Sequence, residues 1–101
     1  MEARIKQSLI SAVFEFAEGN GMDIDVTDYE LGFKVDGIFF YAYVDVMASG
    51  ETEEESDTGA WRWKHIYITV NVREIVEVEA ERTLTVDLAE WSNDIERAIA
   101  V

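Results

Sequence analysis

The stretch 29-YELGFKVDGIFFYAYVDVM-47 decides the fold, because it reads as a complete β-hairpin. Asp36-Gly37 lies between two alternating runs, and an Asp-Gly pair tolerates the positive φ angles of a two-residue type I′ turn. Such a turn fixes the register and places Val35 opposite Ile38. One side of the hairpin then carries an apolar set that must face the core: Tyr29, Leu31, Phe33, Val35, Ile38, Phe40, Ala42 and Val44.

The other side of this hairpin is polar but carries large rings. A third strand is expected over residues 60–72, where aliphatic residues alternate with rings in the same way. The aliphatic set belongs in the core, so the predicted aromatic face holds Phe39, Tyr41, Tyr43, Trp61, Trp63 and Tyr67. Two interpretations stay open: the rings form an exposed interface, or a helix or the loop over residues 48–59 covers them.

Helices are expected at both ends of the chain. An apolar stripe of helical period predicts a helix over residues 2–18, which Gly19-Asn20-Gly21 ends. Asp87 followed by Glu90 resembles a capping box, and apolar residues then recur at helical spacing as far as Ile99. The sequence therefore predicts a second amphipathic helix near the C-terminus.

The connections within the sheet are less strongly marked. Residues 48–59, ASGETEEESDTG, hold five carboxylates and no cation, which predicts a solvated, mobile loop. A fourth strand is expected over residues 75–86. We favour a tight hairpin at Arg73-Glu74 as the connection to it. The alternative is one long strand over residues 61–80 that bends back near Glu81-Arg82. A change of phase in the apolar pattern near Asp28 predicts a bulge.

These elements give a single α+β domain over residues 1–101, in the order α-β-β-β-β-α. We expect a four-stranded antiparallel meander with the N-terminal and C-terminal helices packed on one face. The residues predicted to share one core are Val35, Ile38, Phe40, Ile66, Ile68, Val70, Val78, Trp91 and Ile95.

Composition limits the possible functions. The chain has no cysteine, which excludes disulfides and thiolate metal sites. It also has no apolar run long enough to span a bilayer. We therefore expect a cytoplasmic location. Twenty-two acidic and eight basic residues give a net charge of −14. This charge repels nucleic acid and anionic membrane, so we expect neither as a direct partner and predict a basic protein surface instead.

Catalysis and metal binding are not expected. His65 is the only histidine, and no Ser-His-Asp arrangement can be argued for it. The carboxylates between Asp23 and Glu30, like those of residues 48–59, lack the spacing of a calcium loop. We therefore expect no enzyme activity, no cofactor and no metal.

The carboxylates and the aromatic face remain as functional leads. Glu77, Glu79 and Glu81 alternate on the expected fourth strand, ~6.8 Å apart, and a regular row of negative charge resembles a nucleic-acid backbone to a binding protein. The alternative is that the row serves solubility and edge protection. The predicted partner-binding residues are Glu51, Glu53, Glu54, Glu55, Asp57, Glu77, Glu79, Glu81, Tyr41, Tyr43, Trp61 and Trp63.

In size, acidity and lack of catalytic residues, the chain resembles the small phage-encoded inhibitors of host defence, the anti-restriction and anti-CRISPR proteins. This resemblance implies an inhibitor that mimics nucleic acid, blocks a DNA- or RNA-binding partner and works in the host cytoplasm. Two alternatives stay open for the binding surfaces. One is an acidic chaperone or adaptor for a basic, apolar segment of a partner protein, and the other is a homodimer formed through the aromatic face.

Overall fold

The computed structural model of the protein describes residues 1–54 and 59–100. Its elements are α1 (Glu2–Gly19), β1 (Ile24–Val35), β2 (Ile38–Glu54), β3 (Trp61–Glu77), β4 (Arg82–Thr83) and α2 (Leu88–Ile99). The strands form one antiparallel sheet in the order β1-β2-β3-β4. The predicted α-β-β-β-β-α fold is therefore confirmed.

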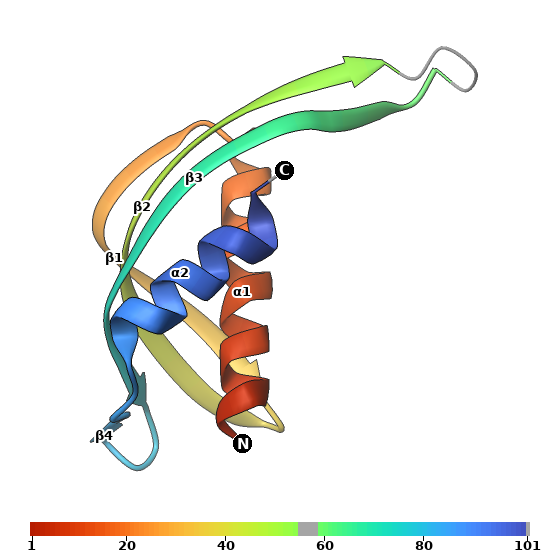
Figure 1. Ribbon diagram of the computed structural model, residues 1–101. Helices are drawn as coiled ribbons and strands as arrows, with labels where there is room; N and C mark the ends of the chain where they lie inside the picture. The colour runs from red at the N-terminus through yellow and green to blue at the C-terminus, as the bar shows by residue number, and fades with distance from the viewer. Residues whose placement is uncertain (55–58, 101) are drawn as a thin grey trace.

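The sheet is curved, and both helices lie against its concave side (Figure 1). We call this side the inner face and the opposite side the outer face. α1 packs on β1, α2 packs on β3, and the two helices touch each other. In the part of the chain that the structure describes, no helix is both long enough and apolar enough to cross a membrane.

The central hairpin has the predicted turn and register. Asp36 and Gly37 have φ angles of 51° and 81°, as a type I′ turn requires. Val35 pairs with Ile38, and the following pairs continue in step as far as Tyr29 and Val44. The Asp-Gly pair thus determines which residues of β1 and β2 face the helices.

The predicted bulge lies in β1 between Val26 and Tyr29. Asp28 has a φ of 53°, and its N–H donates to Oδ1 of Asp45 at 2.7 Å. The extra residue returns Val26 to the inner face, where it packs against the core. Tyr29 was expected in the core but is 39% exposed, because it lies at the margin of the sheet with its ring stacked on Phe16.

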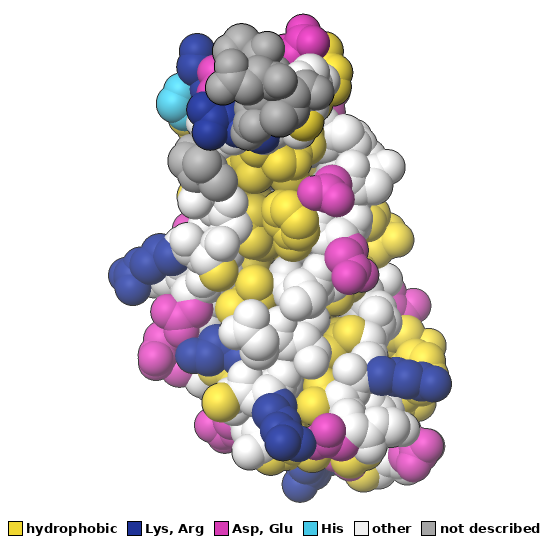
Figure 2. Space-filling model, turned by 90° about the vertical axis from the view of Figure 1, so that its right-hand side faces the viewer, with side chains coloured by type: hydrophobic (Ala, Val, Ile, Leu, Met, Phe, Trp, Pro, Cys, Tyr) yellow, Lys and Arg dark blue, Asp and Glu magenta, His cyan; other side chains and the backbone are white. Residues whose placement is uncertain are grey.

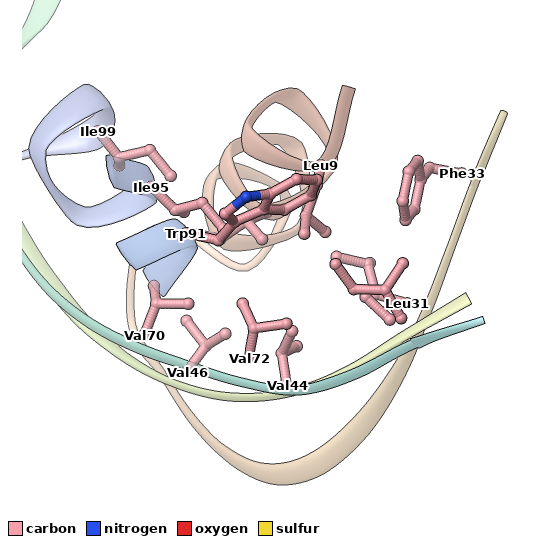
Figure 3. Packing of buried hydrophobic residues seen from close by; sticks show 14 of the residues in the cluster. Leu9, Leu31, Phe33, Val44, Val46, Val70, Val72, Trp91, Ile95 and Ile99 are labelled. Carbon is pink, nitrogen blue, oxygen red and sulfur yellow. The ribbon is translucent and has the colours of Figure 1, made fainter. Parts of the chain in front are cut away.

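The core lies between the inner face and the two helices (Figure 3). Phe40 and Ile95 are fully buried, and Trp91 of α2 is 5% exposed. In Figure 3 the indole of Trp91 extends from α2 toward Leu9 of α1, so this ring joins both helices above the strands. The predicted core is right except for Val78, which is 36% exposed in the turn after β3, while Ile38 and Ile68 lie at its margin.

The predicted mobile loop is wrong for the residues that the structure describes. β2 continues to Glu54 and pairs with the start of β3, so Glu53 lies opposite Arg62 and Glu54 opposite Trp61. The acidic residues are held in a strand because β3 offers them cross-strand partners, including an Arg62–Glu53 ion pair of 2.6 Å. Glu55 and Asp57 lie outside the described residues.

The favoured tight hairpin at Arg73-Glu74 is also wrong, and the alternative with one long strand is closer. β3 runs to Glu77, and the register shifts at Arg73, between the pairs Val44–Val72 and Tyr43–Glu74. This bulge allows Val72 and Ile75 both to face the core, which restores the phase without a turn. The chain reverses over residues 78–81, and the expected fourth strand is only the two residues of β4.

Candidate partner-binding surface

Within the described residues, no helix lies over the outer face of the sheet, and several of its apolar side chains are exposed. Phe39 is 40% exposed, Met47 56% and Tyr67 61%. The register places all three on the face opposite the helices. The rings of β2, together with Tyr67, are therefore not covered, and burial by a helix is excluded for them.

At the hairpin end of this face, the rings lie flat on their neighbours. Gly32 leaves room for Tyr41, because a Cβ at Gly32 would lie 3.2 Å from Cε1 of that ring. The hydroxyl of Tyr43 donates to Oε1 of Glu30 at 3.3 Å, and the negative charge of Glu30 raises the pKa of Tyr43. Tyr41 and Tyr43 are consequently half-buried, and they form a flat surface instead of projecting anchors.

The middle of the outer face is a polar network around Asp45. Its carboxylate accepts from Nε of Arg73 at 2.9 Å, from Nδ2 of Asn71 at 3.2 Å and from the N–H of Asp28 at 2.7 Å. The bond from Arg73 is the largest of the causes that lower the pKa of Asp45 to about 2. Because Asp28 and Arg73 are the bulge residues of β1 and β3, Asp45 holds the two bulges together across β2.

Beyond the buried residue Ile66 and its partner Gly50, the sheet continues as a two-stranded arm that extends past the helices (Figure 1). We define the arm as residues 51–54 of β2 and 61–65 of β3. Hydrophobic side chains gather directly below it, and basic side chains lie beside it together with the histidine, which pairs with Glu51 at its base (Figure 2). The arm therefore carries apolar and charged groups together; of its two tryptophans, Trp63 packs against the core and Trp61 is exposed.

A second register shift in β3 corrects the position predicted for the tryptophans. Glu51 pairs with His65, but the next residue, Thr52, pairs with Trp63, so Lys64 is an extra residue. Trp63 therefore turns to the inner face, where a Cβ on Gly50 would meet its Cζ3 at 2.7 Å. Trp61 follows on the same face and is 68% exposed. The alternation predicted both indoles on the outer aromatic face, and this prediction is wrong.

The predicted row of carboxylates does not form. Glu77 is half-buried in β3 and binds Arg82 at 3.4 Å, whereas Glu79 and Glu81 lie in the turn over residues 78–81. This turn and the arm are at opposite ends of the molecule (Figure 1). The row was expected because residues 75–86 had been interpreted as one strand.

The structure thus divides the predicted partner-binding residues among three places. The arm holds Glu51, Glu53, Glu54, Trp61 and Trp63; the outer face holds Tyr41 and Tyr43; and the distant turn region holds Glu77, Glu79 and Glu81. Met47 was missed, although its odd position in the hairpin pattern matches those of Tyr41 and Tyr43. Asp45 and Arg73 were missed because their contact depends on bulges that a single sequence does not locate.

The described residues contain no group of three or more His, Asp or Glu side chains placed to hold a metal ion. His65 lies beside Tyr67, with ring centroids 5.9 Å apart. This contact gives the histidine a packing role at the base of the arm.

Comparison with protein-family models, with curated proteins and with solved structures finds no match to this chain. No residue role is therefore carried over from a relative. The function follows only from the chemistry and geometry of the outer face, the arm and the charge of the sequence.

Proposed function

We propose that this protein is a binding module for a positively charged protein partner, and that the outer face and the arm contact that partner. The observation that carries this proposal is the exposure of Phe39, Met47 and Tyr67 on a sheet face that neither helix covers. Large apolar side chains in such a position mark interaction surfaces. The catalytic alternative has no comparable support.

The charge of the chain supports a basic partner. The net charge is −14, and the outer face carries Glu30, Asp45, Glu51 and Glu74. Its cations are already engaged, since Arg73 binds Asp45 and Lys34 lies 4.8 Å from the centroid of Phe39. A partner with exposed Lys and Arg would be attracted at long range and would then meet the apolar rings.

We propose that this partner binds DNA or RNA and that this protein inhibits it by competition. The molecule is 50 Å long. One nucleic-acid strand of that length carries about 15 charges, at one charge per ~3.4 Å. The net charge of −14 is close to this value, which supports mimicry of a single strand in overall charge, although the carboxylates form no regular row.

The test begins with a partner captured from bacterial lysate at low salt and released at high salt, then purified. Binding is measured by surface plasmon resonance across salt concentrations, with DNA and RNA oligonucleotides as competitors. We expect association to slow as salt rises, because the Debye length falls from about 10 Å at 0.1 M to about 3 Å at 1 M. We also expect the oligonucleotides to displace the protein.

Two sets of variants separate charge from apolar contact. Changing Glu51, Glu53 and Glu54 together to Gln should slow association, whereas Tyr67→Ala or Trp61→Ala should mainly speed dissociation. Val78→Ala is the matched control, because this exposed apolar residue lies outside the outer face and the arm. Equal effects of Val78→Ala and Tyr67→Ala would exclude the outer face, and partner binding unaffected by oligonucleotides would exclude nucleic-acid mimicry.

A further inference from the structure

The two long edges of the sheet differ in whether their backbone N–H groups have hydrogen-bond partners. On the edge of β3, the N–H of Val72 donates to Oγ of Ser92 at 2.9 Å and the N–H of Val70 donates to Oε1 of Glu96 at 2.7 Å. β4 pairs with the end of the same strand. The opposite edge is β1, which pairs with β2 and with no other strand of residues 1–54 and 59–100. The middle of the β3 edge is thus closed to another strand, whereas β1 is not.

The hydrogen bonds of the sheet show which groups of β1 face the open side. Antiparallel strands alternate between pairs that exchange two backbone hydrogen bonds and pairs that exchange none. The carbonyl of Phe39 accepts from the N–H of Val78 at 3.0 Å, so the backbone of Phe39 faces β3. Its partner Lys34 must turn its own N–H and C=O away from β2. Gly32 and Glu30 follow at alternate positions and share this orientation.

These three residues define the open edge, Glu30–Lys34. Among the described residues, no side chain forms a hydrogen bond with the N–H of Glu30, Gly32 or Lys34, in contrast to Val70 and Val72 on the other edge. The bulge at Asp28 limits the open edge on one side, and the turn at Asp36 limits it on the other. Such an edge is a template for one added strand.

A groove runs between this edge and α1. The ring of Phe16 stacks on Tyr29 with centroids 4.4 Å apart, and Nη1 of Arg4 binds Oδ2 of Asp36 at 2.6 Å. α1 is thus fixed at both ends of the open edge. The space between them is a groove of about 330 Å³, lined by Gly32, Phe33 and Lys34 of β1 and by α1 residues that include Ser8, Ser11 and Glu15.

We infer that the open edge and this groove bind an extended, basic segment of a partner protein, which adds to β1 as a fifth strand. Three residues that each offer an N–H and a C=O allow about six backbone hydrogen bonds. Alternate side chains of the added strand would enter the groove, where the small hydroxyl side chains leave room for them. The edge strand beside a helix thus supplies both affinity and a place for side-chain selection.

The charges around the groove specify a basic segment. Glu15 and Lys34 line it, and the chain around it has a net charge of −14. Asp28 and Glu30 lie at one end of the edge, where the carboxylate of Glu30 accepts from Tyr43 on the outer face. Of the nearby cations, Arg4 is paired with Asp36, and Lys34 lies over the ring of Phe39 on the outer face. A segment with Lys or Arg at alternate positions is complementary to this arrangement. The inference does not rest on the proposed function, because the open edge is separate from the arm and from Tyr67.

The test selects 12-residue random peptides displayed on phage against the full-length protein, with synthetic copies of the enriched peptides as probes. We expect the enriched peptides to be basic and rich in β-branched residues. Hydrogen exchange measured by NMR should show the amides of Gly32 and Lys34 exchanging quickly in the free protein and at least about tenfold more slowly with peptide. Peptides that protect other amides, or a selection that enriches no basic peptide, would overturn the inference.

Two pairs of variants test the contact directly. Lys34→Pro removes an N–H that points away from β2, so the hydrogen bonds between β1 and β2 stay intact. This variant should weaken peptide binding at least about tenfold. Lys34→Ala is the control for loss of the positive charge. Glu15→Lys leaves the edge intact and should weaken basic peptides about tenfold, with Glu18→Lys as the control on the same helix outside the groove. Trp61→Ala should leave peptide binding unchanged. Equal binding to Lys34→Pro and Lys34→Ala, or to Glu15→Lys and Glu18→Lys, would contradict the inference.

Discussion

The hydroxyl of Ser92 in α2 accepts a hydrogen bond of 2.9 Å from the backbone N–H of Val72 in β3. The same hydroxyl donates to the carbonyl of Leu88 at 2.7 Å. Ser92 is 6% exposed and is the one buried polar residue of the described chain. A single side chain therefore joins the helix to the sheet and closes the edge of β3 at this position.

Ser92→Ala should lower the free energy of unfolding by about 1–3 kcal/mol, because it leaves the buried N–H of Val72 without a partner. Chemical denaturation monitored by circular dichroism measures this change. Asn93→Ala, at the next and exposed position of α2, is the control and should change stability by no more than about 0.5 kcal/mol. Equal stability of the Ser92 variant and the wild type would show that water replaces the hydroxyl.

Gly50→Ala should also destabilise the fold, by about 1–3 kcal/mol, because the base of the arm has no space for a methyl group. The added Cβ would lie 2.7 Å from Cζ3 of Trp63 and 2.9 Å from Cγ of Met22. Thermal unfolding and tryptophan fluorescence measure the loss of stability and the displacement of the ring. Ser49→Ala, the exposed neighbour, is the control. A Gly50→Ala variant with unchanged emission would place Trp63 elsewhere.

The sequence predicted what depends on local chemistry. The Asp-Gly turn set the hairpin register, Asp87 caps α2 by accepting from the N–H of Glu90 at 3.0 Å, and the apolar stripes identified both helices. Each of these signals acts over a few residues. The sequence did not show whether the rings on β2 are covered, because this depends on which face of the sheet the helices occupy.

Two errors of prediction come from bulges in β3. An extra residue at Lys64 and another at Arg73 reverse the alternation, so Trp61 and Trp63 were assigned to the wrong face and Arg73 to a turn. The prediction of a mobile loop over the acidic stretch was wrong for a different reason. Its composition suits a loop, but cross-strand pairing with Arg62 and Trp61 holds Glu53 and Glu54 in β2. Such pairing depends on the register between β2 and β3, which the composition of the acidic stretch does not show.

Phe40→Ala should cost about 3–5 kcal/mol, because this ring is fully buried. It stacks on Phe33 with centroids 5.5 Å apart, so truncation leaves a cavity in the core beside that ring. The neighbouring ring provides a matched control: Phe39 is 40% exposed on the outer face, and Phe39→Ala should cost less than half as much. Urea denaturation of both variants compares the two faces, and a reversed order would contradict the register of the hairpin.

Shortening the arm should leave the core intact. Thr52 pairs with Trp63, so an Asn-Gly turn in place of residues 53–62 joins two residues that already face each other. Ala48 and Ile66 are the last buried residues before the arm, and we expect the free energy of unfolding to change by less than about 1 kcal/mol. Thermal unfolding and NMR spectra of the core measure this. Loss of cooperative unfolding would mean that the arm belongs to the folding unit.

The last prediction concerns pH and the network around Asp45. The hydrogen bond from Arg73 is the main cause that lowers the pKa of Asp45 from 3.8 to about 2. A carboxylate whose pKa is lowered by folding stabilises the folded state above its unfolded pKa, and this contribution is lost as the pH falls from about 4 to about 2. Asp45→Asn should therefore be less stable than the wild type near neutral pH, and the difference should shrink over that interval. Urea denaturation from about pH 6 to pH 2 at constant ionic strength measures this difference, with Asp23→Asn as the exposed control.

In parallel, carboxyl NMR titration of an Arg73→Gln variant should show the pKa of Asp45 moving back toward 3.8. A stability difference that stays constant with pH, or an unchanged pKa in the Arg73 variant, would show that Arg73 does not hold the charge of Asp45.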